Sequence, residues 1–203
     1  MTGTGALERL IRRPDTSPPA PGLACELCGQ AVGPGHRHLL DTSRGELLCV
    51  CYPCSVLFHR GEASEGHYRL VPDRRIRLTG VSLRALGVPV GLAFFIRQAD
   101  GSVVAHYPSP AGATQWEVDP AAWEGAVRDC PELAGLAVGV EALLANTTRG
   151  RREAWLVPVD DCHRLVAIVR QNWKGLSGGD RVWPAIERFF DELRRHDGPD
   201  PGG

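Results

Sequence analysis

The sequence predicts an α+β protein in which a small cysteine-rich module is joined to a larger domain with its own core. Three observations lead to this fold class. Five of the seven cysteines lie in one stretch of the chain, from Cys25 to Cys54. Two apolar runs flank an Asp100-Gly101 turn signal, which is typical of an antiparallel hairpin. A stretch near the end of the sequence repeats apolar residues at helical spacing.

Composition divides the chain into four parts. Residues 1–22 predict a short amphipathic helix, built on "ALERLIRR", and then a stiff Pro-rich linker. Residues 23–68 hold the clustered cysteines and predict a metal-binding module. Residues 70–196 have the length and apolar content for an α+β domain with a short antiparallel sheet and a C-terminal amphipathic helix. Residues 197–203 predict a disordered tail.

Charge and hydropathy argue against several partners and compartments. A net charge of -1 gives the chain no general attraction to nucleic acid or to an anionic membrane. The longest apolar runs fall well short of the ~20 residues that span a bilayer, and residues 1–13 lack the apolar core of a secretory signal. We therefore expect a cytoplasmic protein with no membrane insertion. In a reducing compartment, clustered cysteines favour a metal over disulfides.

Two C-x-x-C pairs bracket the module. Cys25-Glu-Leu-Cys28 is followed by Gly29, which permits the positive φ that a tight turn between two ligands needs. In Cys51-Tyr-Pro-Cys54 the proline suits the start of a short helix running into "SVLFHRG". Between the pairs, "HRHLLD" and "GELLCVC" flank a turn-rich segment and predict a β-hairpin.

Knuckle, hairpin and helix follow one another in the order of a treble-clef zinc finger, which residues 23–62 resemble. The spacing predicts that one metal ion is held by four thiolates, namely Cys25, Cys28, Cys51 and Cys54. Four thiolates form a closed tetrahedral shell, which is typical of structural zinc. Thiolate ligands also suit iron, so a rubredoxin-like redox site remains an alternative.

Four further residues in the module have side chains that bind metals. Cys49 precedes Cys51 by two residues and is an alternative ligand to it if the stretch is a strand. His36 and His38 share one face of the facing strand, and with Cys49 and His59 they offer a second metal or redox cluster. The simpler interpretation is surface histidines and a half-buried thiol. A nucleic-acid-binding zinc protein or HNH-like nuclease is a further alternative, because "HRHLLD" and His59 loosely resemble the HNH pattern, although that family's Asp-His order and helix Asn are missing.

The larger domain is predicted element by element. The strands are "VPVGLAFFIRQ", "SVVAHYP" and "REAWLVPV". A helix begins at Pro120 with Asp119 as its N-cap. The segment "DDCHRLVAIVRQNW" has β-branched residues that suit a strand, but its apolar spacing favours a helix with Asp160 as its cap. The last helix, "GDRVWPAIERFFDELRRH", is capped by Asp180 and presents one apolar face.

No catalytic constellation is evident in this domain, so we do not expect an enzyme. Cys162 and His163 are adjacent, and their side chains diverge on a helix or a strand. Glu141 and the basic strip "VPDRRIRL" (Arg74, Arg75 and Arg77) are interpreted as solvated, although the strip could meet an acidic partner. A Gly-rich loop precedes the last helix, and its backbone N–H groups could bind an anion. The candidate residues are Lys174, Gly175, Ser177, Gly178 and Gly179.

Segments spread along residues 22–194 resemble an uncharacterised actinobacterial family encoded beside high-affinity uptake nickel–iron hydrogenases. They include "CELC", "HRHLLD", "LLCVCYPC", "EALLAN" and, most distinctively, "WKGLSGG". The resemblance implies an accessory role in hydrogenase assembly, maturation or electron supply, with hydrogenase subunits or maturation factors as protein partners. It implies no catalytic residues, and the sequence predicts no oligomeric state.

Overall fold

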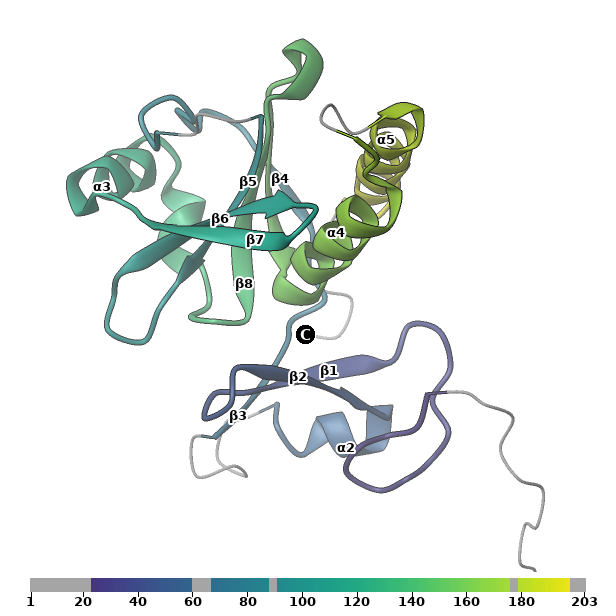
Figure 1. The fold of residues 1–203 in the computed structure, drawn as a ribbon. Helices are drawn as coiled ribbons and strands as arrows, with labels where there is room; N and C mark the ends of the chain where they lie inside the picture. The colour runs from purple at the N-terminus through teal and green to yellow at the C-terminus, as the bar shows by residue number, and fades with distance from the viewer. Residues whose placement is uncertain (1–22, 60–66, 88–90, 176–178, 198–203) are drawn as a thin grey trace, which may run out of the picture.

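The computed structural model describes residues 23–59, 67–87, 91–175 and 179–197, and it is an α+β structure with two antiparallel sheets (Figure 1). The helix predicted within residues 1–13 and the Pro-rich linker lie outside the described residues. The small module comprises β1 (Arg37–Asp41), β2 (Glu46–Val50), α2 (Tyr52–Val56) and β3 (Tyr68–Leu70). The larger part comprises β4 (Ile76–Leu78), β5 (Leu92–Arg97), β6 (Val103–Ser109), β7 (Gly112–Glu117), α3 (Pro120–Asp129), η2 (Pro131–Gly135), β8 (Glu141–Asn146), η3 (Thr148–Gly150), β9 (Glu153–Pro158), α4 (Val159–Asn172) and α5 (Gly179–Arg195).

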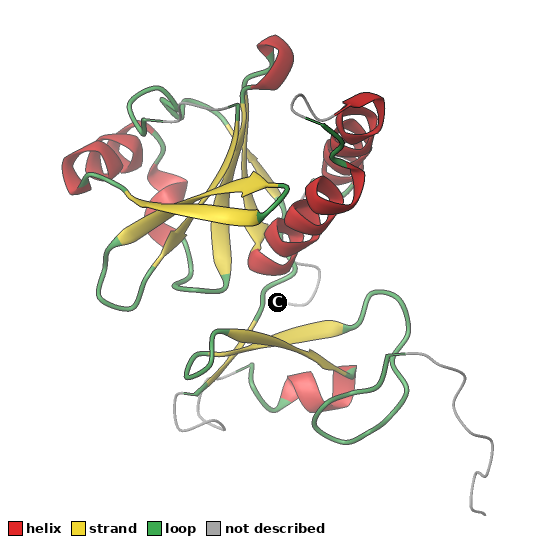
Figure 2. Cartoon of the chain, in the orientation of Figure 1, coloured by secondary structure: helices red, strands yellow, loops and turns green. Residues whose placement is uncertain are grey.

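The larger sheet has six strands in the order β4-β9-β8-β5-β6-β7, and every neighbouring pair is antiparallel. Helices α4 and α5 cover one face, and α3 with η2 covers the other (Figures 1 and 2). Side chains of β5 alternate between the two cores, with Phe94 toward α4 and α5 and Phe95 toward α3. The central strands are therefore apolar on both faces, and a sheet covered on both sides requires this.

Most elements predicted in the larger part are confirmed. Strands β5 and β6 form the predicted hairpin, and β9 and α4 also occupy predicted segments. Asp119 caps α3, with its carboxylate accepting a hydrogen bond from the Ala121 N–H at 2.7 Å. The apolar face of α5 is buried as predicted, with Phe189 and Phe190 each 1% exposed. Strands β4, β7 and β8 were not predicted.

Two helix starts differ from prediction. Helix α4 follows β9 directly, so Pro158 occupies the N-cap position and Asp160 lies inside the first turn. Its carboxylate is then available for contacts outside the helix. Helix α5 begins at Gly179, which places Asp180 inside its first turn as well.

The prediction of a solvated Glu141 is wrong, because Glu141 begins β8 and is 0% exposed. Its carboxylate accepts two hydrogen bonds from Arg74, one of them at 2.7 Å from Nη2, and a third from the Ala137 N–H at 2.8 Å. Arg75 likewise pairs with Asp161, at 2.7 Å. Two of the three arginines in the basic strip therefore have carboxylate partners within the chain.

The small sheet, in the order β2-β1-β3, lies between α2 and the larger part (Figure 1). Leu39 and Val50 are 0% exposed and pack beside the paired cysteines. Leu40 and Leu47, directly opposite one another, pack instead against the core formed by α4 and α5. The opposite faces of this sheet thus belong to two different cores, which joins the module to the larger part.

None of the helices in the described parts of the chain combines the length and the apolar character that crossing a membrane requires.

Candidate metal centre

The first C-x-x-C pair sits in a tight turn held by backbone hydrogen bonds. The Gly29 N–H donates to the Cys25 carbonyl at 2.8 Å, and the Cys25 N–H donates to the Gln30 carbonyl at 2.7 Å. Gly29 has φ +76°, the left-handed conformation expected from the sequence. Glu26 joins this turn to β2, since its N–H donates to the Cys49 carbonyl and its carboxylate accepts from the Cys49 N–H. The knuckle is therefore fixed against the hairpin.

The second pair lies where β2 ends and α2 begins. Cys51 is the N-cap residue of α2, and Cys54 lies one turn further along the helix. Pro53 occupies the first turn, where its missing N–H costs nothing. The Ser55 N–H donates to the Cys51 carbonyl at 3.0 Å and so closes the first helical turn. Both thiols consequently point from a short rigid element toward the knuckle.

The four predicted ligands converge. The sulfur atoms of Cys25, Cys28, Cys51 and Cys54 all lie within 4.8 Å of one another, and those of Cys28 and Cys51 are 3.7 Å apart. All four are free thiols rather than disulfides. Four thiolates on a tetrahedral ion with bonds of about 2.3 Å lie roughly 3.8 Å apart. The donor set and its spacing fit a metal ion, and both zinc and iron accept such ligands.

The hydrophobic core of the module is too small to stabilise it alone, and a bound metal would take over part of that role. Its cluster of buried residues comprises Cys25, Leu39, Val50 and Cys51, so two of the four belong to the four-cysteine group. A segment of this size buries too little apolar surface to be stable alone. The thiols supply the anchoring points that additional core residues would otherwise provide.

The pKa shifts of Cys25, Cys28 and Cys54 differ in direction. Burial alone would raise the pKa of Cys25, but N–H groups of Cys51, Cys28 and Leu27 lower it to about 6. Hydrogen bonds with the Cys51 and Cys28 thiols raise the pKa of Cys54 to about 12. The Gln30 N–H lowers the pKa of Cys28, but its contact with Cys25 contributes to a net rise. The Cys25 thiolate therefore forms readily, whereas thiolates at Cys28 and Cys54 require a nearby cation.

Metal affinity is therefore expected to fall steeply with acidification. At pH 7 the metal must displace protons at least from Cys28 and Cys54, so affinity should fall by about 100-fold or more per pH unit. Below the pKa of Cys25, near 6, the Cys25 proton competes as well and the dependence steepens. Competition titrations of zinc against a chelator from pH 5.5 to 8 measure this slope. A pH-independent affinity would contradict four-thiolate ligation.

Cys49 does not take the place of Cys51. Strand β2 ends at Val50, so the alternation of faces stops before Cys51, which turns into the four-cysteine group. The Cys49 side chain joins His36 and His38 instead, in a second group whose ligand atoms lie within 4.8 Å of one another. His59 follows α2, is exposed, and does not belong to that group. The HNH-like arrangement, which needed His59 beside the strand histidines, is not assembled among the described residues.

Two other predictions concern the Cys162–His163 pair and the Gly-rich loop. Cys162 is 0% exposed whereas His163 points outward, so the two side chains diverge as expected for a helix. In the Gly-rich loop, Lys174 and Gly175 are exposed and Gly179 begins α5. Ser177 and Gly178 lie outside the described residues, and the anion site stays a prediction.

The sequence does not predict that Asp160 lies next to the module. The carboxylate of Asp160, in the first turn of α4, lies 2.8 Å from Nδ1 of His38 in β1. The local sequence supports a capping role for Asp160 equally well. Only the packing of the small sheet against α4 brings the two residues together.

These features define a class: an α+β protein carrying a four-cysteine cluster placed to bind a metal ion. The chain belongs to the family of unknown function DUF5947, whose model matches residues 24–197. That match covers both the cysteine module and the sheet domain. Comparison with curated proteins gave no match, and comparison with solved structures gave none either.

Proposed function

We propose that this protein is a zinc-dependent accessory factor whose four-cysteine module, of treble-clef type, docks onto a partner protein. A closed shell of four thiolates leaves no position for substrate, so the ion stabilises the module instead of performing chemistry. The observation that carries the proposal is the distribution of exposed apolar side chains.

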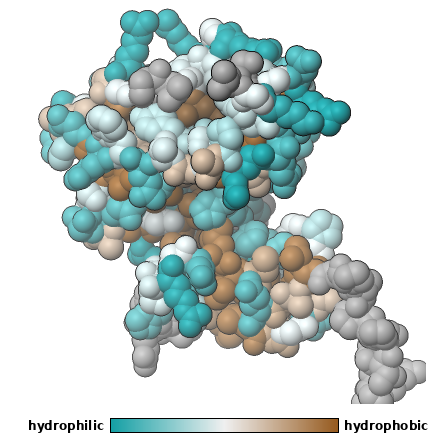
Figure 3. All heavy atoms as spheres, in the orientation of Figure 1, coloured by the Kyte–Doolittle hydropathy of each residue, from teal (hydrophilic) through white to brown (hydrophobic). Residues whose placement is uncertain are grey.

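Five of the six large apolar side chains exposed in the described residues lie on the small module, where Figure 3 also shows apolar residues gathered. They are Leu23, Leu27, Tyr52, Val56 and Leu57. Tyr52 and Val56 lie one turn apart on α2, and Leu27 lies between the two ligands of the knuckle. The largest exposed fractions, 68% for Tyr52 and 62% for Leu57, are unusual for such side chains. Clustered exposed apolar residues mark protein interaction sites.

The identity of the partner is inferred separately, from the sequence resemblance alone. The likeness to a family encoded beside uptake nickel–iron hydrogenases supports a hydrogenase subunit or maturation factor as the partner. The near-neutral chain and the apolar character of the exposed surface favour a protein over nucleic acid.

Replacing Tyr52 and Leu57 together by alanine should reduce co-purification of the tagged protein with hydrogenase subunits by 10-fold or more. Apolar anchors near the centre of an interface each contribute about 2 kcal/mol or more to binding. The matched control is Trp116→Ala, which removes an equally exposed aromatic from β7. Normal hydrogenase maturation and activity in a deletion strain would contradict the hydrogenase role. Equal loss in the control variant would contradict the surface assignment.

Iron at the same four cysteines is the second candidate. Cys28 is exposed, so one edge of the cluster reaches the surface, as electron transfer to a partner requires. A ferric four-thiolate site absorbs visible light, whereas zinc is colourless. Metal analysis and a visible spectrum of protein purified without added metal decide between the two ions.

A further inference from the structure

A second group of metal-binding side chains occupies the other face of the small sheet. His38 and Cys49 are directly opposite one another in the β1–β2 pairing, and His36 precedes β1 on the same side as His38. Leu40 and Leu47, one pair further along, continue this face into the core of the larger part. The group is thus separated from the four-cysteine cluster by the sheet itself and lies beside the junction with α4.

The geometry of the three side chains suits one small ion. Their ligand atoms lie within 4.8 Å of one another, and the two imidazole rings are 4.7 Å apart at 60°. Ligands around tetrahedral zinc, bound at about 2.0–2.3 Å, lie roughly 3.3–3.8 Å apart. A contraction on the order of 1 Å, within the reach of side-chain rotation, would bring the three atoms into a common shell.

Both imidazoles are already oriented by their other nitrogen. His36 Nδ1 lies 3.0 Å from the Gly33 carbonyl, which can only accept, so Nδ1 carries the proton and Nε2 keeps its lone pair. That Nε2 is buried without a hydrogen-bond partner. A buried acceptor with no partner is costly, and a metal ion would satisfy it.

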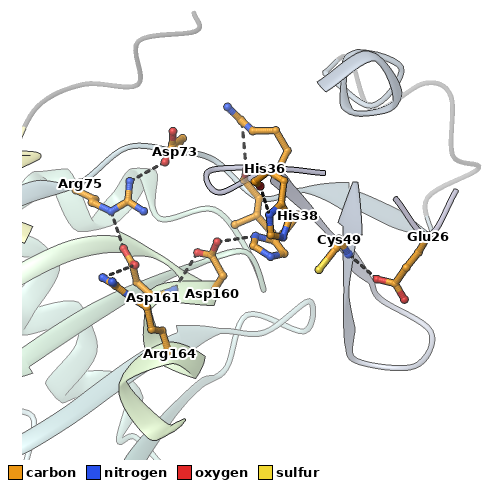
Figure 4. Close-up of polar contacts among 12 residues, drawn as sticks. Glu26, His36, His38, Cys49, Asp73, Arg75, Asp160, Asp161 and Arg164 are labelled. Atoms are coloured by element: carbon orange, nitrogen blue, oxygen red, sulfur yellow. Dashed lines mark hydrogen bonds and ion pairs between the residues drawn. The ribbon is translucent and has the colours of Figure 1, made fainter. Parts of the chain in front are cut away.

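His38 is held in the way typical of metal-ligating histidines. Its Nδ1 lies 2.8 Å from Oδ2 of Asp160, while Oδ1 of the same carboxylate accepts from the Asp161 N–H at 2.9 Å (Figure 4). Asp161 is in turn paired with Arg75. Carboxylate–histidine pairs of this kind fix the ring and strengthen the remaining nitrogen as a ligand.

We propose that His36, His38 and Cys49 form a second metal site, which binds a Zn²⁺-type transition ion with an open fourth position. Two imidazoles and one thiolate suit such ions better than Ca²⁺ or Mg²⁺. On binding, Cys49 loses its thiol proton to solvent and no electron is transferred. Among the described residues no fourth side chain belongs to the group, so the remaining position holds water or another exchangeable donor. The site is therefore chemically different from the closed four-cysteine shell, and it does not depend on partner docking.

Cobalt binding tests the site in the full-length protein. Protein with its four-cysteine metal in place is treated with a mild chelator and then titrated with Co²⁺. Wild type should bind one further equivalent and show a thiolate-to-cobalt band with tetrahedral visible bands. His36→Ala should weaken this binding by more than about 100-fold, because the loss of a direct ligand exceeds the 10–100-fold expected for outer-shell changes. Cys49→Ser should abolish the thiolate band. His59→Ala, which removes an exposed histidine of the same module, should match wild type.

Asp160 acts as a positioning residue, and its variants separate that role from a structural one. Asp160→Ala should weaken Co²⁺ binding 10–100-fold, and Asp160→Asn, which keeps an oxygen acceptor for His38, should recover part of the loss. The metal content of the four-cysteine site and the circular dichroism spectrum should stay unchanged in each variant. Excess imidazole should shift the cobalt bands by entering the open position.

Several results would overturn the proposal. Wild-type protein that takes up no cobalt beyond its four-cysteine metal lacks a second site. Unchanged cobalt affinity and spectrum in His36→Ala and Cys49→Ser would place the extra ion elsewhere. Cobalt bands that ignore imidazole would contradict the open position.

Discussion

Replacing Cys28 by serine is expected to unfold the cysteine module while the six-stranded sheet and its helices stay folded. Cys28 is exposed, and substitutions at exposed positions away from special features are close to neutral. Cys28 is, however, one of four thiols placed to bind a metal in a module with very little core, so we expect zinc affinity to fall by more than about 100-fold. Hydrogen exchange in the full-length protein should show loss of protection in β1, β2 and α2, with protection retained in β5 and β8.

The neighbouring variant Leu27→Ala is the control for this experiment. Leu27 lies in the same turn and is 40% exposed, but its side chain offers no ligand. Its protection pattern should match that of wild type. A Cys28→Ser protein that keeps both its zinc and its protected module would show that the four thiols are not a metal shell.

Arg74→Ala should lower the free energy of unfolding by about 3 kcal/mol. The substitution leaves Glu141 as a buried carboxylate without its counter-charge, and breaking a buried pair from one side costs about 3–5 kcal/mol. The lower end applies because the Arg74 side chain is 33% exposed, so water can partly solvate the remaining carboxylate. Urea unfolding followed by circular dichroism measures the change.

Two comparisons make this result specific. Arg77→Ala removes an exposed arginine three residues further along the same strip and should cost less than about 1 kcal/mol. Combining Arg74→Met with Glu141→Gln removes both charges and should recover much of the lost stability. Equal stability of Arg74→Ala and Arg77→Ala would show that the buried pair contributes nothing.

The elements that the sequence predicts correctly are those with a strong local signal. Paired cysteines with Gly29 and Pro53 mark the knuckle and the start of α2 by backbone chemistry alone. Asp100-Gly101 marks the β5–β6 hairpin, and the apolar period of α5 matches its buried face. In each case a short stretch contains the physical cause of the structure.

The elements that the sequence misses depend on distant partners. Strand β8, "EALLAN", consists mostly of good helix formers, and it is extended because it lies between β5 and β9 under two cores. Glu141 is satisfied by Arg74, 67 residues away along the chain. The sequence predicts that His36, His38 and Cys49 could form a second group. That His59 lies outside this group and Asp160 contacts it follows only from the packing.

The two faces of the small sheet also differ in when they can be completed during synthesis of the chain. All four cysteines of the first cluster precede every strand of the large sheet, so a ribosome-bound chain already contains that complete set of thiols. The second group waits for Asp160, which follows β9, and until α4 and α5 appear Leu40 and Leu47 have no core to enter. The first group of side chains can thus be complete before the larger part folds, whereas the second group acquires its Asp160 contact only in the finished molecule.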